Sequence, residues 1–272
     1  MKTIFITGAS SGIGKAAAIY FQQQGWQVAA TMRTPANEQE INQLDNVKLF
    51  QLDVTDENSI QKAVADSLAT FGNIDVVLNN AGYGTVGAFE AATQEQIKRQ
   101  FDTNLFGLMN VTRAFLPHFR SLKAGLFINI SSIGGLVTFP VFSLYHATKW
   151  AVEGLSESLC YELGALGIGV KIVEPGGVKT DFGGRSLDWL INPALTDYAP
   201  TLERMQAVFG NPERVANYSS AELIAAKVFE AATDGSTQLR YVVGADAVQM
   251  YESRKQIGDV AFMDMIKGMF LG

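Results

Sequence analysis

Short apolar runs recur along this chain, and stretches with the period of an amphipathic helix separate them. Runs of this kind, bounded by turn residues, predict strands that are buried on both faces of a sheet. They occupy residues 3–7, 26–32, 47–52, 74–78, 126–130, 170–173 and 240–243. Because helical stretches alternate with these runs, the pattern predicts an α/β fold with one doubly wound, seven-stranded parallel sheet.

The helical stretches and the irregular regions define the domain organisation. Helices are expected from residues 55–58 to Phe71, over 93–117, up to about Leu163, over 221–233 and in a final amphipathic segment at 246–271. Residues 181–217 carry mixed signals, with several glycines and prolines, and are expected to form a lid. Since no linker or repeat interrupts the pattern, we expect one domain over residues 1–272.

Composition narrows the class of protein. The chain has 272 residues, 47% of them hydrophobic, and a formal net charge of −6, which argues against a nucleic-acid-binding protein. The single cysteine, Cys160, lies in a helical pattern and is interpreted as a core residue. No signal-peptide pattern and no long apolar span is present, so the expectation is a cytoplasmic protein without a membrane span.

A glycine-rich turn follows the first apolar run and precedes a helical stretch. Gly8, Gly12 and Gly14 give the spacing G-x-x-x-G-x-G, which permits a tight turn and close approach of the backbone to a phosphate. The N-terminus of the following helix would direct free N–H groups at a pyrophosphate. In this context of strand, turn and helix, the motif predicts a dinucleotide site in a Rossmann-type fold.

The end of the second predicted strand bears on the choice of nucleotide. An acidic residue at this place would accept a hydrogen bond from a ribose 2′-hydroxyl and suit NAD, but the chain has Met32 followed by Arg33. A guanidinium matches a 2′-phosphate, so the sequence favours NADP(H) over NAD(H). A solvated surface arginine is the competing interpretation.

Polar residues in unusual places mark the other candidate positions. Asn104 lies inside the helix predicted over 93–117, where a buried amide without partners would cost about 1–3 kcal/mol. Tyr145 and Lys149 are four residues apart and therefore lie on one face of a helix. A lysine charge beside a phenol favours the phenolate, so we expect Lys149 to lower the pKa of Tyr145.

These motifs together resemble the short-chain dehydrogenase/reductase family. The resemblance rests on residues 7–14, on Asn79-Asn80-Ala81-Gly82, on Ser132, Tyr145 and Lys149, and on Pro175-Gly176, in that order. Ser132 stands thirteen residues before Tyr145, and Asn104 matches the family's helix asparagine. The resemblance extends from Thr3 to about Gly244, and the family's phosphate loop has the same glycine spacing.

The resemblance implies a role for each matched residue. Tyr145 would be the general acid or base, Lys149 would lower its pKa and hold the nicotinamide ribose, Ser132 would bind the substrate oxygen, and Asn104 would keep a helix distortion and a relay water. The implied cofactor-binding set is Gly8, Ser10, Ser11, Gly12, Ile13, Gly14, Arg33, Asp53, Val54, Asn80, Ala81, Gly82, Tyr145, Lys149, Pro175, Gly176, Val178 and Thr180. A small-molecule carbonyl or alcohol substrate and a homodimer or homotetramer are implied as well.

Within the family, the chain is similar to the group that resembles 17β-hydroxysteroid and retinol dehydrogenases. A 3-oxoacyl-carrier-protein reductase is the alternative, but such chains usually end soon after the last strand, whereas this one continues past Val243. Phe139, Val141, Phe142 and Phe182 near the expected pocket suit a lipophilic ketone, or simply pack the lid.

Functions of other classes remain open at this stage. A non-catalytic NADP-binding regulator would usually lack part of the catalytic set, which is present here, and a sugar epimerase would have a larger substrate domain. No cysteine, histidine or carboxylate cluster has the spacing of metal ligands, so no metal site is predicted. His146 is interpreted as structural.

Overall fold

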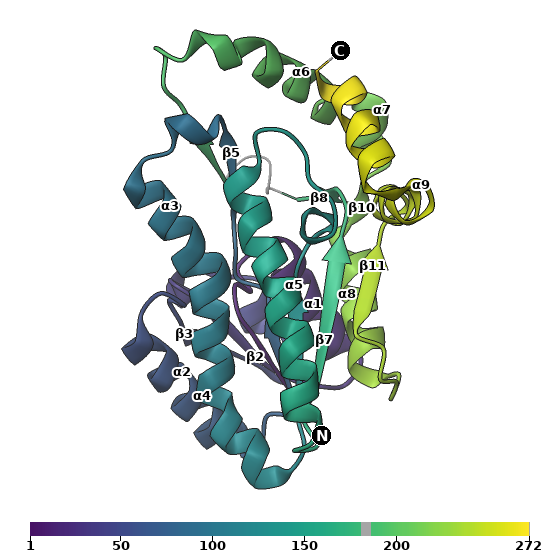
Figure 1. Ribbon diagram of the computed structural model, residues 1–272. Coiled ribbons are helices and arrows are strands. Elements are labelled where there is room, and N and C mark those ends of the chain that lie inside the picture. Colours follow the sequence, from purple (N-terminus) through teal and green to yellow (C-terminus); the bar gives the residue numbers. More distant parts are fainter. Residues whose placement is uncertain (181–185, 272) are drawn as a thin grey trace.

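The computed structural model describes residues 1–180 and 186–271 (Figure 1). At its centre is a parallel sheet with the strand order β11-β7-β6-β4-β1-β2-β3. The strands are β1 (Thr3–Ile6), β2 (Gln27–Met32), β3 (Val47–Gln51), β4 (Val76–Asn79), β6 (Leu126–Ile130), β7 (Gly169–Pro175) and β11 (Arg240–Val243). This confirms the predicted doubly wound, seven-stranded α/β fold, with every predicted strand present.

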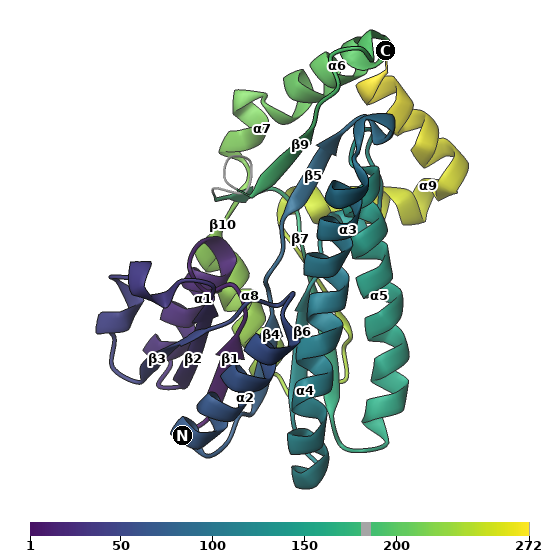
Figure 2. The same cartoon turned by 90° about the vertical axis from the view of Figure 1, so that its left-hand side faces the viewer.

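Helices cover both faces of this sheet (Figure 2). On one face lie α1 (Gly12–Gln23) and α8 (Ala221–Thr233), and on the other lie α2 (Glu57–Phe71), α4 (Gly107–Leu122) and α5 (Ser143–Gly164). Successive side chains of β1 alternate between the two cores: Ile4 and Ile6 pack in the first, while Phe5 packs in the second, 4.8 Å from the ring of Phe115. Because neither face of the central strands meets water, β1 and β4 are buried at every position, whereas the edge strand β3 exposes Lys48 and Gln51.

The helix predicted over 93–117 is longer and less regular than expected. It comprises α3 (Gln94–Phe101), a π-helical turn (Asp102–Phe106) and α4, which continues through Pro117 to Leu122. The predicted end was wrong because Phe115 and Phe119, on either side of Pro117, are fully buried against the sheet, and this packing outweighs the missing N–H of the proline. Lys123, in the left-handed region with φ 50°, ends the helix.

The predicted lid region contains regular structure that the sequence pattern did not indicate. Its described part includes β9 (Leu187–Leu190), α6 (Ala199–Phe209) and α7 (Pro212–Ala216). Strand β9 pairs in parallel with β5 (Gly84–Gly87), and the two-residue strands β8 (Val178–Lys179) and β10 (Ser219–Ser220) pair in the same way. The sequence analysis missed these four strands because each is only two to four residues long. Strand β5 also begins and ends with a glycine, so it carries no apolar run.

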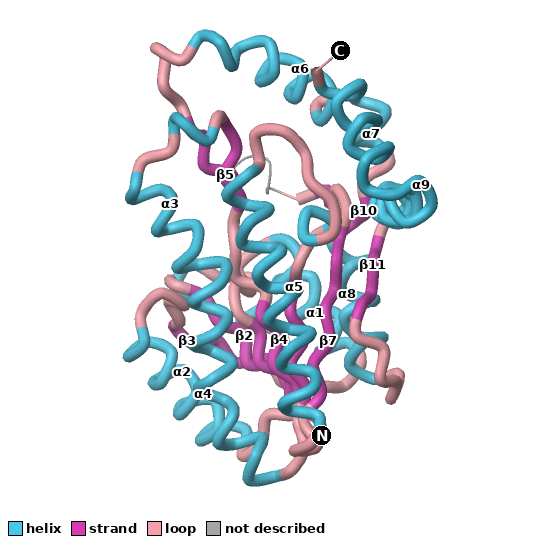
Figure 3. Tube along the Cα trace, viewed as in Figure 1, coloured by secondary structure: helices cyan, strands magenta, loops and turns pink. Residues whose placement is uncertain are grey.

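The final helix, α9 (Ala245–Phe270), confirms the predicted amphipathic segment and is broken at Gly258, where φ is 78°. Together with α6 it forms a third apolar cluster that includes Met205, Phe262 and Phe270. Figure 3 shows α6, α7 and α9 beyond the end of the sheet toward which β7 runs. This arrangement leaves the carboxyl ends of the strands beneath a helical cover.

Candidate active site

The candidate residues gather where the parallel strands end. The glycine-rich turn follows β1, Asn80 follows β4, Ser132 follows β6 and Gly176 follows β7. These four strands are neighbours in the sheet, in the order β7-β6-β4-β1. The carboxyl edge of an open parallel sheet is the general location of ligand sites in such folds.

The backbone of the glycine-rich turn requires glycine at several positions. Gly8 and Gly12 have positive φ values of 69° and 54°. A Cβ on Gly14 would lie 2.3 Å from the carbonyl oxygen of Gly8 and 2.5 Å from Nδ2 of Asn80. The α1 N-cap residue, Ser11, makes no side-chain capping hydrogen bond, so the first N–H groups of the helix are available to an anion. The turn therefore has the backbone geometry that the glycine spacing predicted, and the binding of a pyrophosphate there stays a prediction.

Asn80 supports this turn from the neighbouring strand. Its Nδ2 donates to the carbonyl oxygens of Thr7 at 2.9 Å and Gly8 at 3.1 Å. In return, the Thr7 hydroxyl accepts from the backbone N–H groups of Asn80 at 2.9 Å and Ala81 at 3.0 Å. The side chain of Asn80 is therefore engaged in holding the loop, and Thr7 belongs to this support although the sequence analysis gave it no role. Gly82 follows, with the Asn104 amide beside it.

Arg33 follows β2 directly and is exposed. No hydrogen bond or ion pair joins its side chain to another residue of the described chain. The nearest acid beyond it in sequence, Glu38, is buried and accepts from Lys15 at 3.2 Å and from the N–H groups of Glu40 at 2.8 Å and Ile41 at 3.1 Å. These contacts lower the pKa of Glu38 against the effect of burial, which raises it. A guanidinium is therefore available at this place, whereas the acid is already engaged.

Asp53 and Val54 follow β3. The Asp53 carboxylate accepts from the N–H of Thr55 at 2.9 Å and from its hydroxyl at 2.7 Å. The side chain of Val54 is buried in the second core, so close to α4 that a Cβ on Gly107 would lie 2.8 Å from it. Both residues lie at the expected edge of the sheet.

Ser132 and Tyr145 form the chemical centre of the site. Ser131 is buried, whereas Ser132 is partly exposed and hydrogen-bonds the Tyr145 side chain. The Ser132 Oγ also accepts from the N–H of Gly134 at 3.0 Å. Because adjacent residues of an extended backbone point to opposite sides, only one of the two serines faces Tyr145. The structure agrees with the choice of Ser132.

Lys149 lies one turn after Tyr145 on α5 and is 7% exposed. Its Nζ donates to the carbonyl oxygen of Ile130 at 2.8 Å and lies 5.7 Å from the centroid of the Tyr145 ring. Burial lowers the pKa of Lys149 to about 8, and the negative charge of Glu153 opposes this effect. The position of Lys149 beside Tyr145 is therefore fixed by a hydrogen bond. Its pKa, and so its fraction of positive charge, depends on burial and on the charge of Glu153.

The expected lowering of the Tyr145 pKa is not found. Burial raises the pKa of the phenol to about 12, and the hydrogen bond with Ser132 offsets only part of this rise. The physical reason is desolvation, which disfavours the phenolate more than the groups around it favour that form. A neutral phenol is a proton donor, so in this arrangement Tyr145 is suited to protonate an oxygen atom.

Asn104 occupies the predicted helix distortion. It lies in the π-helical turn Asp102–Phe106 and is 2% exposed. Its Nδ2 donates to the carbonyl oxygen of Tyr83 at 2.8 Å and to the hydroxyl of Thr148 at 3.3 Å, and its Oδ1 accepts from the N–H of Tyr83 at 3.0 Å. The buried amide thus has the partners that the sequence analysis required. Thr148 joins it to the helix of Tyr145 and Lys149.

The turn after β7 closes the other side of the site. The N–H of Gly177 donates to Oδ2 of Asp246 at 2.7 Å, and a Cβ on Gly176 would lie 2.2 Å from Oδ1 of the same carboxylate. Asp246 is in the first turn of α9 and was missed, because nothing in its sequence surroundings distinguishes it. Further along, the Thr180 methyl lies 3.6 Å from where a Cβ on Gly12 would stand. Pro175, Gly176, Val178 and Thr180 therefore extend from β7 toward the glycine-rich turn.

The predicted apolar residues near the pocket pack under the helical cover. The Phe139 ring lies 5.6 Å from Phe209 and 5.8 Å from Phe270, and the Phe142 ring lies 5.4 Å from Phe209. Val141 belongs to the same cluster. Phe182 lies outside the described residues. Much of this aromatic surface is thus used in packing against α6 and α9.

Metal sites and membrane-spanning helices are two further features to consider in the described residues. The described residues include no group of three or more histidine, cysteine, aspartate or glutamate side chains that could hold a metal ion. Within residues 1–180 and 186–271, no helix is both long and apolar enough to cross a bilayer. His146 is buried, and desolvation lowers its pKa to about 4, which keeps the ring neutral.

A protein-family model described as short chain dehydrogenase matches residues 2–190 of this chain. The chain belongs to the short-chain dehydrogenase/reductase family. It is accordingly an oxidoreductase by family, and the fold and the order of the motifs described above agree with this assignment.

Several known proteins are similar to this family member. An uncharacterised oxidoreductase of Schizosaccharomyces pombe is 39% identical over 237 residues, covering 85% of this chain and 96% of that protein. A 3-ketodihydrosphingosine reductase of Bacteroides thetaiotaomicron is 40% identical over 212 residues, covering 78% of this chain and 77% of that protein. Retinol dehydrogenase 8 of Bos taurus is 34% identical over 196 residues, covering 69% of this chain and 62% of that protein.

Solved structures show the same architecture. A short-chain dehydrogenase from Streptomyces avermitilis superposes with a TM-score of 0.81 at 36% identity, covering 94% of each chain. ElxO with NADP bound has a TM-score of 0.75 at 26% identity, covering 91% of this chain and 99% of its own.

Proposed function

We propose that this protein is an NADP(H)-dependent reductase of lipophilic ketones, or a dehydrogenase of the corresponding secondary alcohols. The observation that carries the proposal is the meeting of Ser132, Tyr145 and Lys149 at the end of β6, on the same edge of the sheet as the glycine-rich turn that follows β1. Bound there, the nicotinamide would supply a hydride to the carbonyl carbon.

The residues of the chain would provide the remaining requirements of the reaction. The Ser132 hydroxyl would donate a hydrogen bond to the carbonyl oxygen, which gains negative charge during reduction. Tyr145, whose neutral form is favoured by burial, would transfer its proton to the same oxygen. Lys149 would stabilise the phenolate that remains, and Asn104 would hold the helix turn beside Thr148 in place.

The choice of NADP(H) rests on the end of β2. Arg33 is exposed and unengaged, whereas Glu38 is tied to Lys15 and to two backbone N–H groups. A guanidinium can form charge-assisted hydrogen bonds with a 2′-phosphate, and no free carboxylate at this place would repel one. The NADP bound to the structural neighbour ElxO supports the same choice.

The lipophilic substrate is inferred from the part of the apolar cluster with Phe139, Val141 and Phe142 that is not used in packing against Phe209 and Phe270, since all three residues are only partly buried. The names of two relatives, 3-ketodihydrosphingosine reductase and retinol dehydrogenase 8, support this inference. A homodimer or homotetramer stays a prediction of the family resemblance, and a cytoplasmic location stays a prediction from the sequence pattern.

The proposal is tested by two measurements on the purified protein. Quenching of protein fluorescence should give tighter binding of NADPH than of NADH. Oxidation of NADPH should then accelerate with long-chain, steroid or aromatic ketones, and less with short 3-oxoacyl thioesters. NADPH binding without turnover of any carbonyl would contradict the enzymatic role and favour a nucleotide-sensing protein.

A further inference from the structure

Helix α5 carries a row of four polar side chains, of which the proposed reaction uses only the first two. Tyr145, Lys149, Glu153 and Glu157 follow one another at intervals of four residues, so they form a single ridge along the helix. Glu153 is 5% exposed, which is rare for a carboxylate without a strong structural reason. The acid thus lies one turn beyond Lys149, in protein surroundings.

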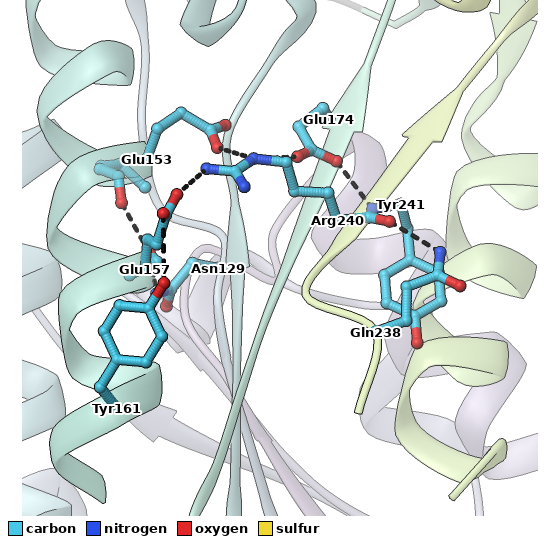
Figure 4. A network of polar contacts seen from close by, with 10 residues as sticks. Asn129, Glu153, Glu157, Tyr161, Glu174, Gln238, Arg240 and Tyr241 are labelled. Carbon is cyan, nitrogen blue, oxygen red and sulfur yellow. Dashed lines mark hydrogen bonds and ion pairs between the residues drawn. The ribbon is translucent and has the colours of Figure 1, made fainter. Parts of the chain in front are cut away.

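The Glu153 carboxylate is fixed from two other elements. Its Oε2 accepts from Nε of Arg240, on β11, at 3.1 Å, and Nη2 of the same guanidinium donates to Glu157 at 2.7 Å (Figure 4). Its Oε1 lies near the hydroxyl of Ser131, the residue that follows β6: both atoms lie within 3.0 Å of the place where a Cβ on Gly135 would stand. Glu153 therefore has little freedom to leave Lys149.

Three carboxylates surround Arg240, and they differ in charge. Glu174 is 0% exposed, and burial together with the charge of Glu153 raises its pKa to about 9, so it is neutral at pH 7. The exposed Glu157 keeps its charge, because Arg240 lowers its pKa. Burial raises the pKa of Glu153, but Ser131, Arg240 and Lys149 all oppose this. The Arg240 guanidinium, 3.1 Å from Oε2 of Glu153, favours the negatively charged form of this carboxylate.

Titratable and polar groups from two elements face Lys149. On α5 they are Tyr145 and Glu153, and β6 offers the carbonyl oxygen of Ile130. Beyond Glu153 lie Arg240 of β11 and Glu174 of β7. A groove of about 470 Å³, whose lining includes Glu153, Arg240, Arg254 and Asp259, separates this cluster from α9. Glu153 is thus the carboxylate that acts on Lys149.

We propose that Glu153, held by Arg240, is a positioning residue that maintains the positive charge of Lys149 beside Tyr145. The expected effect on turnover rests on the proposed function. The expected effect on the pKa of Lys149 does not, because it concerns only Glu153 and Lys149. Without the charge of Glu153, burial would act on Lys149 unopposed, and the lysine would lose its proton at a lower pH.

The electrostatic part is tested by NMR on protein labelled with 13C-lysine, with the Lys149 Cε resonance assigned by its loss in Lys149→Arg. We expect Glu153→Gln to lower the pKa of Lys149 by about one unit. The matched control, Glu157→Gln, removes the other carboxylate bound by Nη2 of Arg240 and should leave the Lys149 pKa as in the wild type. An unchanged Lys149 pKa in Glu153→Gln would overturn the proposal.

If Glu153→Gln does not fold, the coupling between Glu153 and Lys149 is measured by a pH titration of the wild-type protein. With 13C-glutamate label as well, the Lys149 Cε resonance should show a second inflection at the pH at which Glu153 titrates. Absence of that inflection would overturn the coupling.

The catalytic consequence is read from the pH profile of kcat with NADPH and a ketone. In Glu153→Gln the alkaline limb should move to lower pH by the same amount as the Lys149 pKa, and Glu153→Asp, which retains the charge, should restore most of the profile. A profile that does not move although the Lys149 pKa has fallen would overturn the positioning role. A shifted Lys149 pKa in a protein whose wild type reduces no carbonyl would refute the proposed function and uphold the coupling.

Discussion

The side chain of Asn104 pairs with the backbone of Tyr83 through both of its polar atoms, at 2.8 Å to the carbonyl oxygen and 3.0 Å from the N–H. This pairing joins the π-helical turn of the long helix to the segment that precedes β5. Because Asn104 also donates to Thr148, one amide links three parts of the chain around Tyr145.

Replacement of this amide should affect both stability and activity. Asn104→Ala removes the partner of the Tyr83 N–H and one of two donors to the Tyr83 carbonyl oxygen, which keeps Gln100 at 3.0 Å. We therefore expect the free energy of unfolding to fall by about 1 to 2 kcal/mol. Chemical denaturation measures this loss. Asn110→Ala, on α4 and partly exposed, is the control and should be close to neutral. Equal stability of the two variants would contradict the structural role of Asn104.

Removal of one oxygen atom tests the proton donor. Tyr145→Phe keeps the ring and its packing, so cofactor affinity should persist, while ketone reduction should fall by about 10²- to 10⁴-fold. Stopped-flow and steady-state assays with NADPH measure the two quantities. Tyr161→Phe, on the same helix and 73% exposed, should be as active as the wild type. Normal turnover by Tyr145→Phe would refute the acid role.

The nucleotide preference depends on one side chain. Arg33→Ala should weaken NADPH binding by about 10- to 100-fold, since charge-assisted hydrogen bonds to the phosphate are lost, and should leave NADH binding nearly unchanged. Fluorescence titration with both nucleotides gives the ratio. Arg113→Ala, an exposed arginine on α4, serves as the control. Equal losses for the two nucleotides in Arg33→Ala would show that Arg33 does not read the phosphate.

The buried carboxyl of Glu174 predicts a pH dependence of stability. Its pKa is raised from 4.5 to about 9 in the folded protein, so its stabilising contribution is complete below pH 4.5 and is lost as the pH rises toward 9. Glu174→Gln stays neutral and keeps an acceptor for the N–H of Tyr241. Relative to the wild type it should therefore gain stability with rising pH, reaching about 2 to 3 kcal/mol at pH 7.

Denaturation with urea between pH 5 and 9 measures this difference. Glu162→Gln, exposed near the end of α5, should run parallel to the wild type. A constant difference between Glu174→Gln and the wild type across this range would mean that Glu174 is ionised in the folded protein.

Features with a local cause could be predicted well. The seven apolar runs became the seven strands of the central sheet, because a strand buried on both faces needs an apolar residue at nearly every position. The helix over Ala221–Thr233 was predicted with its observed bounds. The glycine-rich turn followed in the same way from the glycine spacing, and Gly8 and Gly12 have the positive φ values that such a turn needs. The choice of Ser132 came from its distance of thirteen residues from Tyr145, as the family resemblance implies.

The misses have a different origin. The pairing of β5 with β9 joins Gly84 to Leu187 and depends on tertiary contact rather than on any apolar pattern. The helix end expected at residue 117 was wrong because the packing of Phe115 and Phe119 decided it. The raised pKa of Tyr145 was missed because desolvation depends on how completely the fold surrounds the phenol.

The sequence by itself determined the strands of the sheet and the glycine-rich turn, since each depends on neighbouring positions of the chain. The roles of Asn104, Ser132, Tyr145 and Lys149 come from the family resemblance and stay predictions. Only the tertiary structure decided which charges act on them. Arg240 meets Glu153 across 87 positions of sequence, and Asp246 meets Gly177 across 69. The sign and strength of such interactions depend on burial and distance, which exist only once the strands and helices have packed together.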